Sequence, residues 1–355
     1  MDRCKVLHVV DKLVSSSGVA SVIVNMVEHS SYIQDVAVYS DTDPIIVDRV
    51  EKRGGKVYQI NDVRHNIGIP FKKDISKLLL KNKYTVVHGH LLNSAYIYMR
   101  EAKRHCVPIR IIHSHSAKSA NTLFKRIRND MLKLGIPLWS NVYLACSKPA
   151  AFNAFGKRLA HIVNYGIDTE KFKFNADVRQ FVRRELGIVN GEICIGSVAR
   201  FSPEKNHKFM FKILESTPNA VGVFVGGGKL PDTAQIPESV KFVGVHSDIS
   251  KLYQAFDVFI LPSLFEGFPV SSIEAQCAGL PCLVSNTVTR AIDCSGNVIF
   301  LPIDNPIVWA EKIFELAKKQ RTDGSVAIAN AGMDVLTMVR KIEKLWSGGT
   351  NIDGI

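Results

Sequence analysis

The chain has 355 residues, 46% hydrophobic and 22% charged, and carries a formal net charge of +12 at pH 7. This composition, without low-complexity tracts or internal repeats, excludes a disordered chain and a repeat solenoid. The length exceeds that at which one hydrophobic core keeps growing, so we expect two domains.

The first half of the chain alternates apolar runs, typical of buried parallel strands, with helical stretches. The runs are Val6–Val10, Val36–Tyr39, Val57–Ile60, Val86–His88, Ile109–His113 and Val142–Ala145. Such alternation predicts a doubly wound α/β domain with right-handed crossovers, which we place at residues 1–163.

The opening run Lys5–Val10 is too short for a signal sequence and is followed at once by two charged residues. No stretch of the sequence approaches the ~20 apolar residues of a membrane span. The seven cysteines are scattered and lack the spacing of metal ligands, so they are expected to be reduced core residues. These features favour a cytoplasmic protein.

Gly18 follows the first predicted strand and begins a predicted helix. A glycine at this point lets the backbone approach a phosphate group closely. A plain helix cap by Ser16 or Ser17 explains the same residues, and the sequence leaves both interpretations open.

Two histidine pairs stand at strand ends, His88 with His90 and His113 with His115. Alternate strand residues share a face, so the two pairs could converge on zinc. No carboxylate accompanies them, and we therefore favour a protein without a metal site. The acidic triplet 41–43 lacks the pattern of a metal-binding motif and is expected to be a solvated loop.

Residues 118–134 combine an apolar stripe at helical spacing with surrounding basic residues. The stripe consists of Leu123, Ile127, Met131 and Leu134, and the basic residues are Lys125, Arg126, Arg128 and Lys133. Such a helix could rest on an anionic membrane, or it could face a protein core and leave its basic side in water. Basic residues elsewhere are spread along the chain, so we expect no nucleic-acid partner.

A second alternating series begins near Ile193 and predicts a second Rossmann-like domain at residues 164–332. Its later strands are expected at Val221–Val225, Val240–Val243, Val258–Leu261 and Cys282–Ser285. The segment 165–168 is the expected hinge, with a cleft beneath it. Residues 333–346 have helical periodicity, and residues 347–355 form a tail.

Arg200 and Lys205 follow the predicted strand Cys194–Ala199. A guanidinium fork and a lysine ammonium suit a pyrophosphate, and they would neutralise the charge on a departing nucleoside diphosphate. A pair of surface cations is the alternative. The glycine-rich stretch 226–229 lacks the later Lys-Ser/Thr spacing of a phosphate loop.

Glu266 and Glu274 flank a predicted strand-to-helix turn. In parallel sheets, ligands bind where such turns meet at the carboxyl ends of the strands. A carboxylate can accept hydrogen bonds from neighbouring hydroxyls of a ribose or a sugar, and the amides of residues 267–271 can bind a phosphate, with Pro269 in the first helical turn. Acidic residues at a solvated helix start are the bland alternative.

Three segments in this order resemble the retaining GT-B glycosyltransferases, a family that includes many capsule and exopolysaccharide enzymes. They are Asn164–Phe172, Gly196–Arg200 with Lys205, and Glu266–Glu274. The resemblance covers nearly the whole chain and is strongest over residues 145–281. It implies two Rossmann-like domains with parallel sheets facing a cleft, and a terminal helix that crosses back onto the first domain.

The resemblance also implies roles for individual residues. Arg200 and Lys205 would hold the donor diphosphate, Glu266 the transferred sugar and Glu274 the ribose. The backbone of Phe268, Pro269, Val270 and Ser271 would close around the sugar and phosphate. His115 would contact the donor sugar through its backbone or its ring, while His113 would be a buried strand-end residue.

Two further positions are less settled. His246 would meet the nucleobase or be an exposed loop histidine. The family usually has two adjacent glycines where this chain has Ser17 and Gly18.

The resemblance implies a metal-independent hexosyltransferase without a cofactor, acting with retention of anomeric configuration. The donor would be a nucleotide sugar, expected to be a UDP-sugar, and the acceptor a saccharide or lipid-linked saccharide in surface polysaccharide synthesis. A lipid-linked acceptor would favour membrane contact through residues 118–134, on the inner face of the cell membrane. The alternatives are a nucleotide-sugar epimerase, a non-catalytic nucleotide-sugar sensor and a basic nucleic-acid binder.

Overall fold

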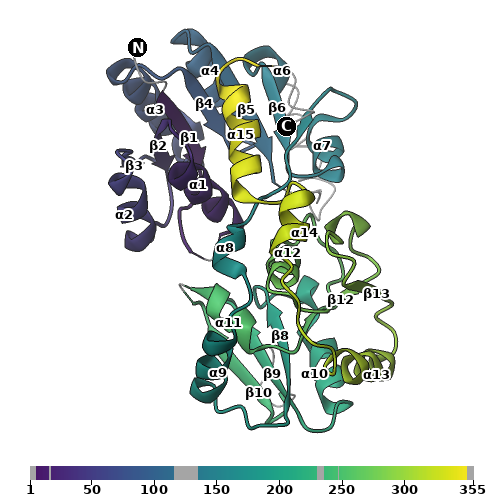
Figure 1. Ribbon diagram of the computed structural model, residues 1–355. Helices are drawn as coiled ribbons and strands as arrows, with labels where there is room; N and C mark the ends of the chain where they lie inside the picture. The colour runs from purple at the N-terminus through teal and green to yellow at the C-terminus, as the bar shows by residue number, and fades with distance from the viewer. Residues whose placement is uncertain (1–4, 16, 116–134, 230–235, 247, 350–355) are drawn as a thin grey trace. The chain divides into compact units, whose positions relative to one another are not determined.

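A computed structural model describes residues 5–15, 17–115, 135–229, 236–246 and 248–349. The chain divides into two compact units, residues 1–165 with 335–355, and residues 166–334. Both units are α/β, and each is described by itself (Figure 1).

The first unit is built on a seven-stranded parallel sheet within the described residues. Its strands are β1 (Lys5–Val10), β2 (Ile33–Val38), β3 (Val57–Gln59), β4 (Val86–Gly89), β5 (Ile109–Ser114), β6 (Val142–Ala145) and β7 (His161–Ile162). The strand order is β3-β2-β1-β4-β5-β6-β7, so the chain reverses direction across the sheet after β3. The carboxyl ends of β1 and β4 therefore lie side by side at the point of reversal.

Helices cover this sheet. They are α1 (Gly18–His29), α2 (Pro44–Lys52), α3 (Ile69–Lys81), α4 (Ala95–Arg104), α6 (Ile136–Trp139), α7 (Lys148–Phe155) and α15 (Val335–Trp346), with the 3₁₀ helix η1 (His65–Gly68). The terminal helix α15 packs against α1. One side of α15 is buried, from Val335 through Met338 and Ile342 to Trp346. This buried side explains the helical periodicity of the segment in the sequence.

Among its described residues, the second unit contains a six-stranded parallel sheet in the order β10-β9-β8-β11-β12-β13. Its strands are β8 (Ile193–Val198), β9 (Ala220–Val225), β10 (Val240–Gly244), β11 (Val258–Leu261), β12 (Cys282–Ser285) and β13 (Val298–Leu301). Its helices are α8 (Thr169–Phe172), α9 (Ala176–Glu185), α10 (His207–Glu215), α11 (Ile249–Ala255), α12 (Val270–Cys277), α13 (Pro306–Leu316) and α14 (Ser325–Asn330), with the 3₁₀ helices η2 (Pro203–Lys205) and η4 (Arg290–Ile292).

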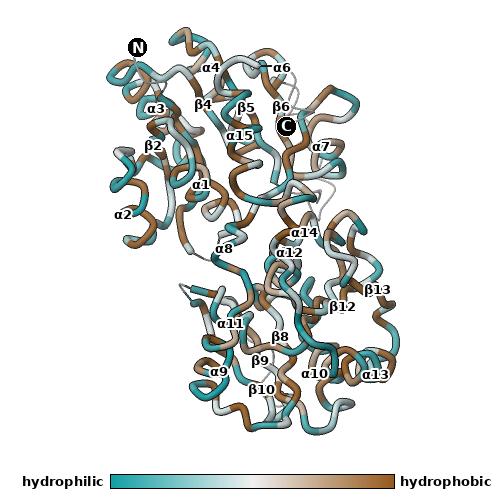
Figure 2. Tube along the Cα trace, viewed as in Figure 1, coloured by the Kyte–Doolittle hydropathy of each residue, from teal (hydrophilic) through white to brown (hydrophobic). Residues whose placement is uncertain are grey.

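The central strands of both sheets are apolar because both of their faces are covered. All residues of β9, β11 and β12 are buried. The brown tube along β8 and β9 contrasts with teal segments on the surrounding helices (Figure 2). Residue 257, just before β11, is the exception. The Asp257 carboxylate accepts from the Cys194 amide at 2.7 Å and pairs with Arg183 at 3.0 Å, so it anchors the start of the sheet.

The predicted strands are confirmed, with boundary shifts of at most three residues. The prediction omitted β7 and β13, each of which forms one edge of its sheet. Strand β7 has only two residues and gives no periodic signal. Strand β13 is a four-residue apolar run, and its composition would have supported a strand prediction.

No helix in the described part of the chain is long and apolar enough to cross a membrane. Among the described cysteines, Cys106, Cys146, Cys194, Cys277, Cys282 and Cys294 are free thiols. The basic segment 118–134 lies outside the described residues.

Candidate active site

The carboxyl ends of the paired strands β8 and β11 carry the predicted cationic and acidic residues of the second unit. Two contacts fasten the loops that follow these strands. The Leu264 amide donates to the Glu204 carbonyl at 2.8 Å, and Asn206 Nδ2 donates to the Pro262 carbonyl at 3.2 Å. Asn206 has a left-handed backbone conformation (φ 58°), which turns the chain from η2 into α10.

Lys205 of the loop after β8 and Glu266 of the loop after β11 form an ion pair. Lys205 Nζ lies 2.6 Å from Glu266 Oε1, and their side chains are 15% and 10% exposed. Ser263 Oγ donates to the same carboxylate oxygen at 2.6 Å. An ammonium group has three N–H donors, so the ion pair fixes Lys205 and leaves donors for phosphate oxygens.

Arg200 is held much less tightly. Its side chain is 63% exposed, and Arg200 Nη2 lies 3.8 Å from Glu204 Oε1, a distance typical of a loose surface pair. The guanidinium is therefore free to turn toward an anion. The structure brings Lys205 and Glu266 into contact, and it places Arg200 on the same loop without fixing its position.

The glycine-rich stretch 226–228 lies against the backbone that precedes and follows Arg200. The Phe201 amide donates to the Gly227 carbonyl at 2.8 Å, and Phe201 also bridges Gly228. A Cβ on Gly226 would lie 2.0 Å from the Ala199 carbonyl oxygen, and its φ of +150° is rarely adopted by L residues. The glycines are thus needed for the close packing of two backbone segments. This role is compatible with the absence of the Lys-Ser/Thr spacing of a phosphate loop.

Gly226→Ala is expected to destabilise the second unit by about 2–4 kcal/mol, because the added methyl group clashes with backbone and the conformation is strained. Gly191→Ala is the matched control. Gly191 has φ +91°, but a Cβ there would meet nothing within 4 Å, so strain alone remains. Chemical denaturation of both variants measures the difference, and equal losses would contradict the close-packing role of Gly226.

Glu274 lies in the second turn of α12 and is partly buried against α11. Tyr253 Oη is 2.7 Å from Glu274 Oε2 and 3.1 Å from the Ser271 carbonyl oxygen. Burial raises the pKa of Glu274 to about 7, opposed by the Tyr253 hydrogen bond and by Lys171. A protonated Glu274 could donate to Tyr253 while Tyr253 donates to Ser271, which satisfies all three groups. The carboxyl is therefore poised to change charge near neutral pH.

Helix α12 begins between the two glutamates. Pro269 is its N-cap residue and makes no side-chain cap, whereas the sequence interpretation placed Pro269 inside the first turn. The difference is one residue and arises because Pro269 has an extended ψ of 95°. Phe268 and Pro269 are buried, so their contribution to a ligand would come from backbone. Val270 and Ser271 form the first turn, where amide groups favour an anion.

His246 follows β10 and is exposed. Its Nδ1 accepts from the Asp248 amide at 3.2 Å, so the ring is oriented by its own loop. Val245 contacts the glycine stretch, since a Cβ on Gly227 would lie 2.7 Å from Val245 Cγ2. The loops after β9 and β10 therefore pack together, and the contact of His246 with a nucleobase stays a prediction.

In the first unit, Ser17 is the N-cap of α1, and its side chain accepts from the Ala20 amide. A Cβ on Gly18 would meet nothing within 4 Å, so packing within the unit does not require a glycine there. The capping interpretation is confirmed, and the phosphate contact of Gly18 remains a prediction. The Asp43 carboxylate accepts from the Ile45 amide at 3.0 Å and caps α2, so this member of the acidic triplet acts as a helix cap.

His115 follows β5 and lies in a cluster with the other strand-end histidines. His115 Nε2 is 2.7 Å from His90 Nδ1, and His115 Nδ1 contacts the hydroxyl of Tyr165. Burial lowers the pKa of His115 to about 3, so the ring is neutral at physiological pH. The two predicted histidine pairs do converge, and His8 of β1 joins them.

Sequence reasoning missed Ser263 and Tyr253, which hold the two glutamates. Ser263 stands three residues before Glu266 at the end of a buried strand, a position from which it could have been suspected. Tyr253 is on a different helix from Glu274, and no local signal connects them.

Comparisons with solved structures identify the fold of the two units. The crystal structure of Anabaena HepE in complex with UDP superposes with a TM-score of 0.79 at 18% identity, covering 97% of this chain and 100% of that one. The structure of WaaG, a glycosyltransferase of lipopolysaccharide biosynthesis, superposes with a TM-score of 0.72 at 15% identity, covering 97% and 99%. The two parallel α/β units thus have the GT-B fold.

Sequence comparisons indicate the kind of protein that has this fold here. Residues 178–323 match the family model described as glycosyl transferases group 1. The putative glycosyltransferase EpsF of Bacillus subtilis is 28% identical, with 98% of each chain covered. An Escherichia coli UDP-Gal:alpha-D-GlcNAc-diphosphoundecaprenol alpha-1,3-galactosyltransferase is 30% identical over 59% of this chain and 60% of its own. Residues 178–323 therefore form a group 1 glycosyltransferase domain.

Proposed function

We propose that this protein transfers a hexose-type sugar from a UDP-sugar to a saccharide or lipid-linked saccharide, with retention of anomeric configuration, in surface polysaccharide synthesis. The observation that carries the proposal is the Lys205–Glu266 pair at the carboxyl end of the second sheet, 2.6 Å apart and mostly buried. A cation and an acceptor of hydroxyl hydrogens held side by side suit the junction of a sugar and its phosphate.

Each group of the donor has a candidate partner. Lys205 and the mobile guanidinium of Arg200 would hold the diphosphate, and Glu266 would accept from sugar hydroxyls. Glu274, oriented by Tyr253, would accept from the ribose hydroxyls. The amides of Val270 and Ser271 would add dipole stabilisation as charge grows on the leaving diphosphate.

In the proposed reaction, the bond from the anomeric carbon to the phosphate oxygen breaks as the acceptor oxygen bonds to the same face of the sugar. The leaving phosphate oxygen would take the acceptor proton, so atoms and charge balance without a covalent enzyme intermediate. Lys205 then acts by electrostatic stabilisation and Glu266 by orientation. The UDP-galactose and lipid diphosphate named for the E. coli relative support this choice of donor and acceptor class.

The test is transfer itself. Purified protein is incubated with UDP-, GDP- and ADP-sugars and with a saccharide diphospholipid acceptor, and the product anomer is assigned by NMR. Transfer from a UDP-sugar with retention supports the proposal. Inversion, or exclusive use of another nucleotide, would contradict it. Release of an epimerised donor without acceptor would support the epimerase, and tight donor binding without turnover the sensor.

We also propose that transfer needs no metal ion, because lysine and arginine side chains take the place of a cation at the diphosphate. Activity should therefore survive EDTA with less than a twofold change. A loss of activity that Mg²⁺ or Mn²⁺ restores would contradict this. Control reactions with a separate metal-dependent glycosyltransferase verify that the chelator is effective.

Membrane contact through residues 118–134 is a further part of the proposal and rests on sequence alone. Binding to vesicles with anionic lipid should exceed binding to neutral vesicles and should fall with salt. Neutralising Lys125, Arg126 and Arg128 should remove that difference. Equal sedimentation with both kinds of vesicle would contradict it.

A further inference from the structure

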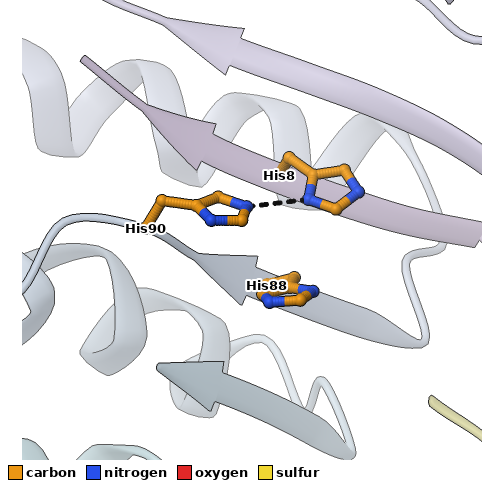
Figure 3. Close-up of side chains that lie close together, drawn as sticks. All are labelled: His8, His88 and His90. Carbon is orange, nitrogen blue, oxygen red and sulfur yellow. Dashed lines mark hydrogen bonds between the residues drawn. The ribbon is translucent and has the colours of Figure 1, made fainter. Parts of the chain in front are cut away.

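Five buried or partly buried histidines of the first unit lie in mutual contact at the carboxyl ends of three adjacent strands. His8 is on β1, His88 and His90 are at the end of β4, and His113 and His115 are at the end of β5. Figure 3 shows the bond from His90 to His8, with His88 on the neighbouring strand. Two triads within this cluster have nitrogen atoms close enough to hold a metal ion, His8 with His88 and His90, and His90 with His113 and His115.

The protons on one chain of these rings are fixed by Gln34. Gln34 Nε2 donates to the Met26 carbonyl at 2.8 Å, so Gln34 Oε1 faces His8 Nε2 at 2.9 Å as an acceptor. His8 therefore carries its proton on Nε2 and accepts at Nδ1. Since a neutral imidazole has one donor and one acceptor, this choice dictates the next ring.

The same reasoning runs outward to Tyr165. His90 Nε2 must donate to His8 Nδ1 at 3.0 Å, which leaves His90 Nδ1 to accept from His115 Nε2 at 2.7 Å. His115 Nδ1 then accepts from the Tyr165 hydroxyl. Burial raises the pKa of Tyr165 well above its usual value, so this hydroxyl stays protonated. Every hydrogen bond of the chain points from Tyr165 toward Gln34.

A second chain is fixed by Trp346. An indole N–H can only donate, and Trp346 Nε1 lies 3.2 Å from His88 Nδ1. His88 therefore donates from Nε2 to His113 Nδ1 at 3.2 Å. His113 must carry its own proton on Nε2, where it has no hydrogen-bond partner among the described residues although the residue is 1% exposed.

These assignments argue against a resident metal ion. A metal takes a lone pair from each neutral imidazole. In all five rings the lone pair is on Nδ1, and each of these nitrogens already accepts a hydrogen bond. A metal could bind only after this network had broken.

We infer that the five histidines form two ordered hydrogen-bond relays, and that His90, His8 and Gln34 are positioning residues that hold His115 in a single tautomer. This inference rests on the proposed function, since His115 is a predicted site residue of the first unit. Both ring nitrogens of His115 are used inside the unit, so its contact with the donor sugar would be made by backbone. The relay also ends on Tyr165, the last residue before the chain enters the second unit.

Tautomers can be read from long-range ¹H–¹⁵N spectra of the full-length, EDTA-treated protein with ¹⁵N-labelled histidine. All five rings should be neutral and protonated at Nε2 from pH 6 to 8. Assignments use His→Gln variants one at a time. A proton on Nδ1 of His8, His90 or His115 would overturn the relay. So would loss of the Nε2 protons with stoichiometric Zn²⁺ binding, which would identify a metal site. This experiment needs no donor, so it is independent of whether transfer occurs.

Activity separates positioning from simple packing. In His90→Ala, His115 loses its acceptor and gains room for water, so its pKa should rise toward the usual value. The groups in contact with His115 are then His113 and Tyr165. Cys146 bonds to Tyr165, and the Asp35 carboxylate lies near His8. We expect kcat/KM to fall on the order of 10-fold and the pH profile to gain a limb between pH 6 and 7.

His88→Ala is the matched control, because it removes an equally buried ring from the other relay. It should leave the His115 tautomer and the shape of the pH profile unchanged. Identical pH profiles for His90→Ala and the wild type would contradict the positioning role. If His90→Ala does not fold, the wild-type tautomers still decide the matter.

Discussion

Lys205→Ala is expected to lower kcat by roughly 10²–10³-fold, the usual effect of removing one preorganised group that stabilises developing charge. Lys205 is fixed by Glu266 at 2.6 Å, so its ammonium needs no reorganisation as the diphosphate departs. The loss should fall mainly on kcat, because the charge on the leaving oxygen grows in the transition state. Steady-state kinetics with saturating acceptor measure this.

Lys208→Ala is the control, because Lys208 is exposed three residues further along and should be dispensable. Arg200→Ala should also reduce kcat, but less, since its exposed side chain must first be ordered. A Lys205→Ala enzyme with wild-type kcat would contradict the assigned role. If Lys205→Ala lowers the free energy of unfolding by as much as it raises the activation free energy of transfer, the Lys205–Glu266 pair is chiefly structural.

Glu274→Ala is expected to weaken donor binding by about 10–100-fold, the range for losing a charge-assisted hydrogen bond. The wild-type affinity should also depend on pH. Burial raises the Glu274 pKa to about 7, so below that pH the free protein holds a neutral carboxyl, which is a weaker acceptor for the ribose hydroxyls than the carboxylate. Donor affinity should rise from pH 6 to pH 8, most steeply near 7. Isothermal titration with UDP across this range measures the trend.

The contribution of Glu274 to folding stability changes with pH in the opposite direction to donor affinity. A raised carboxyl pKa means that the folded, unliganded protein binds the proton more tightly than the unfolded chain, so this contribution is greatest below pH 4.5 and is lost as pH rises to about 7. Glu274→Gln should remove both trends while keeping the shape of the side chain. Tyr253→Phe should raise the pKa of Glu274 further and move the binding profile to higher pH. A wild-type affinity that is flat from pH 6 to pH 8 would contradict this assignment.

Much of the site could be predicted from the sequence, because its residues lie just after predicted strands. The runs before Arg200 and Glu266 are apolar on both faces, and in a parallel sheet their carboxyl ends share one edge. That Lys205 would pair with Glu266 was not predictable, since each was assigned to a different part of the donor. The pairing follows from the contacts between loops at Leu264 and Asn206.

The histidine relays mark the limit of sequence reasoning. Spacing placed two histidine pairs on one face of neighbouring strands, yet their proton positions follow from Gln34 and Trp346, which lie far away in the chain. No periodicity connects these residues, because the contacts form only when β1, β2 and the terminal helix pack on the same unit.

The sequence alone predicts alternating α/β structure, because strands covered on both faces must be apolar and the helices between them must be amphipathic. It also predicts which residues follow the strands. The folded structure was needed to show which of these residues touch, that glycines 226–228 serve backbone packing, and that the histidine lone pairs accept hydrogen bonds from neighbouring histidines, Tyr165 and Trp346. Whether a hydrogen bond or ion pair forms depends on differences of roughly a few tenths of an ångström in the distance between segments far apart in the chain, which local patterns do not encode.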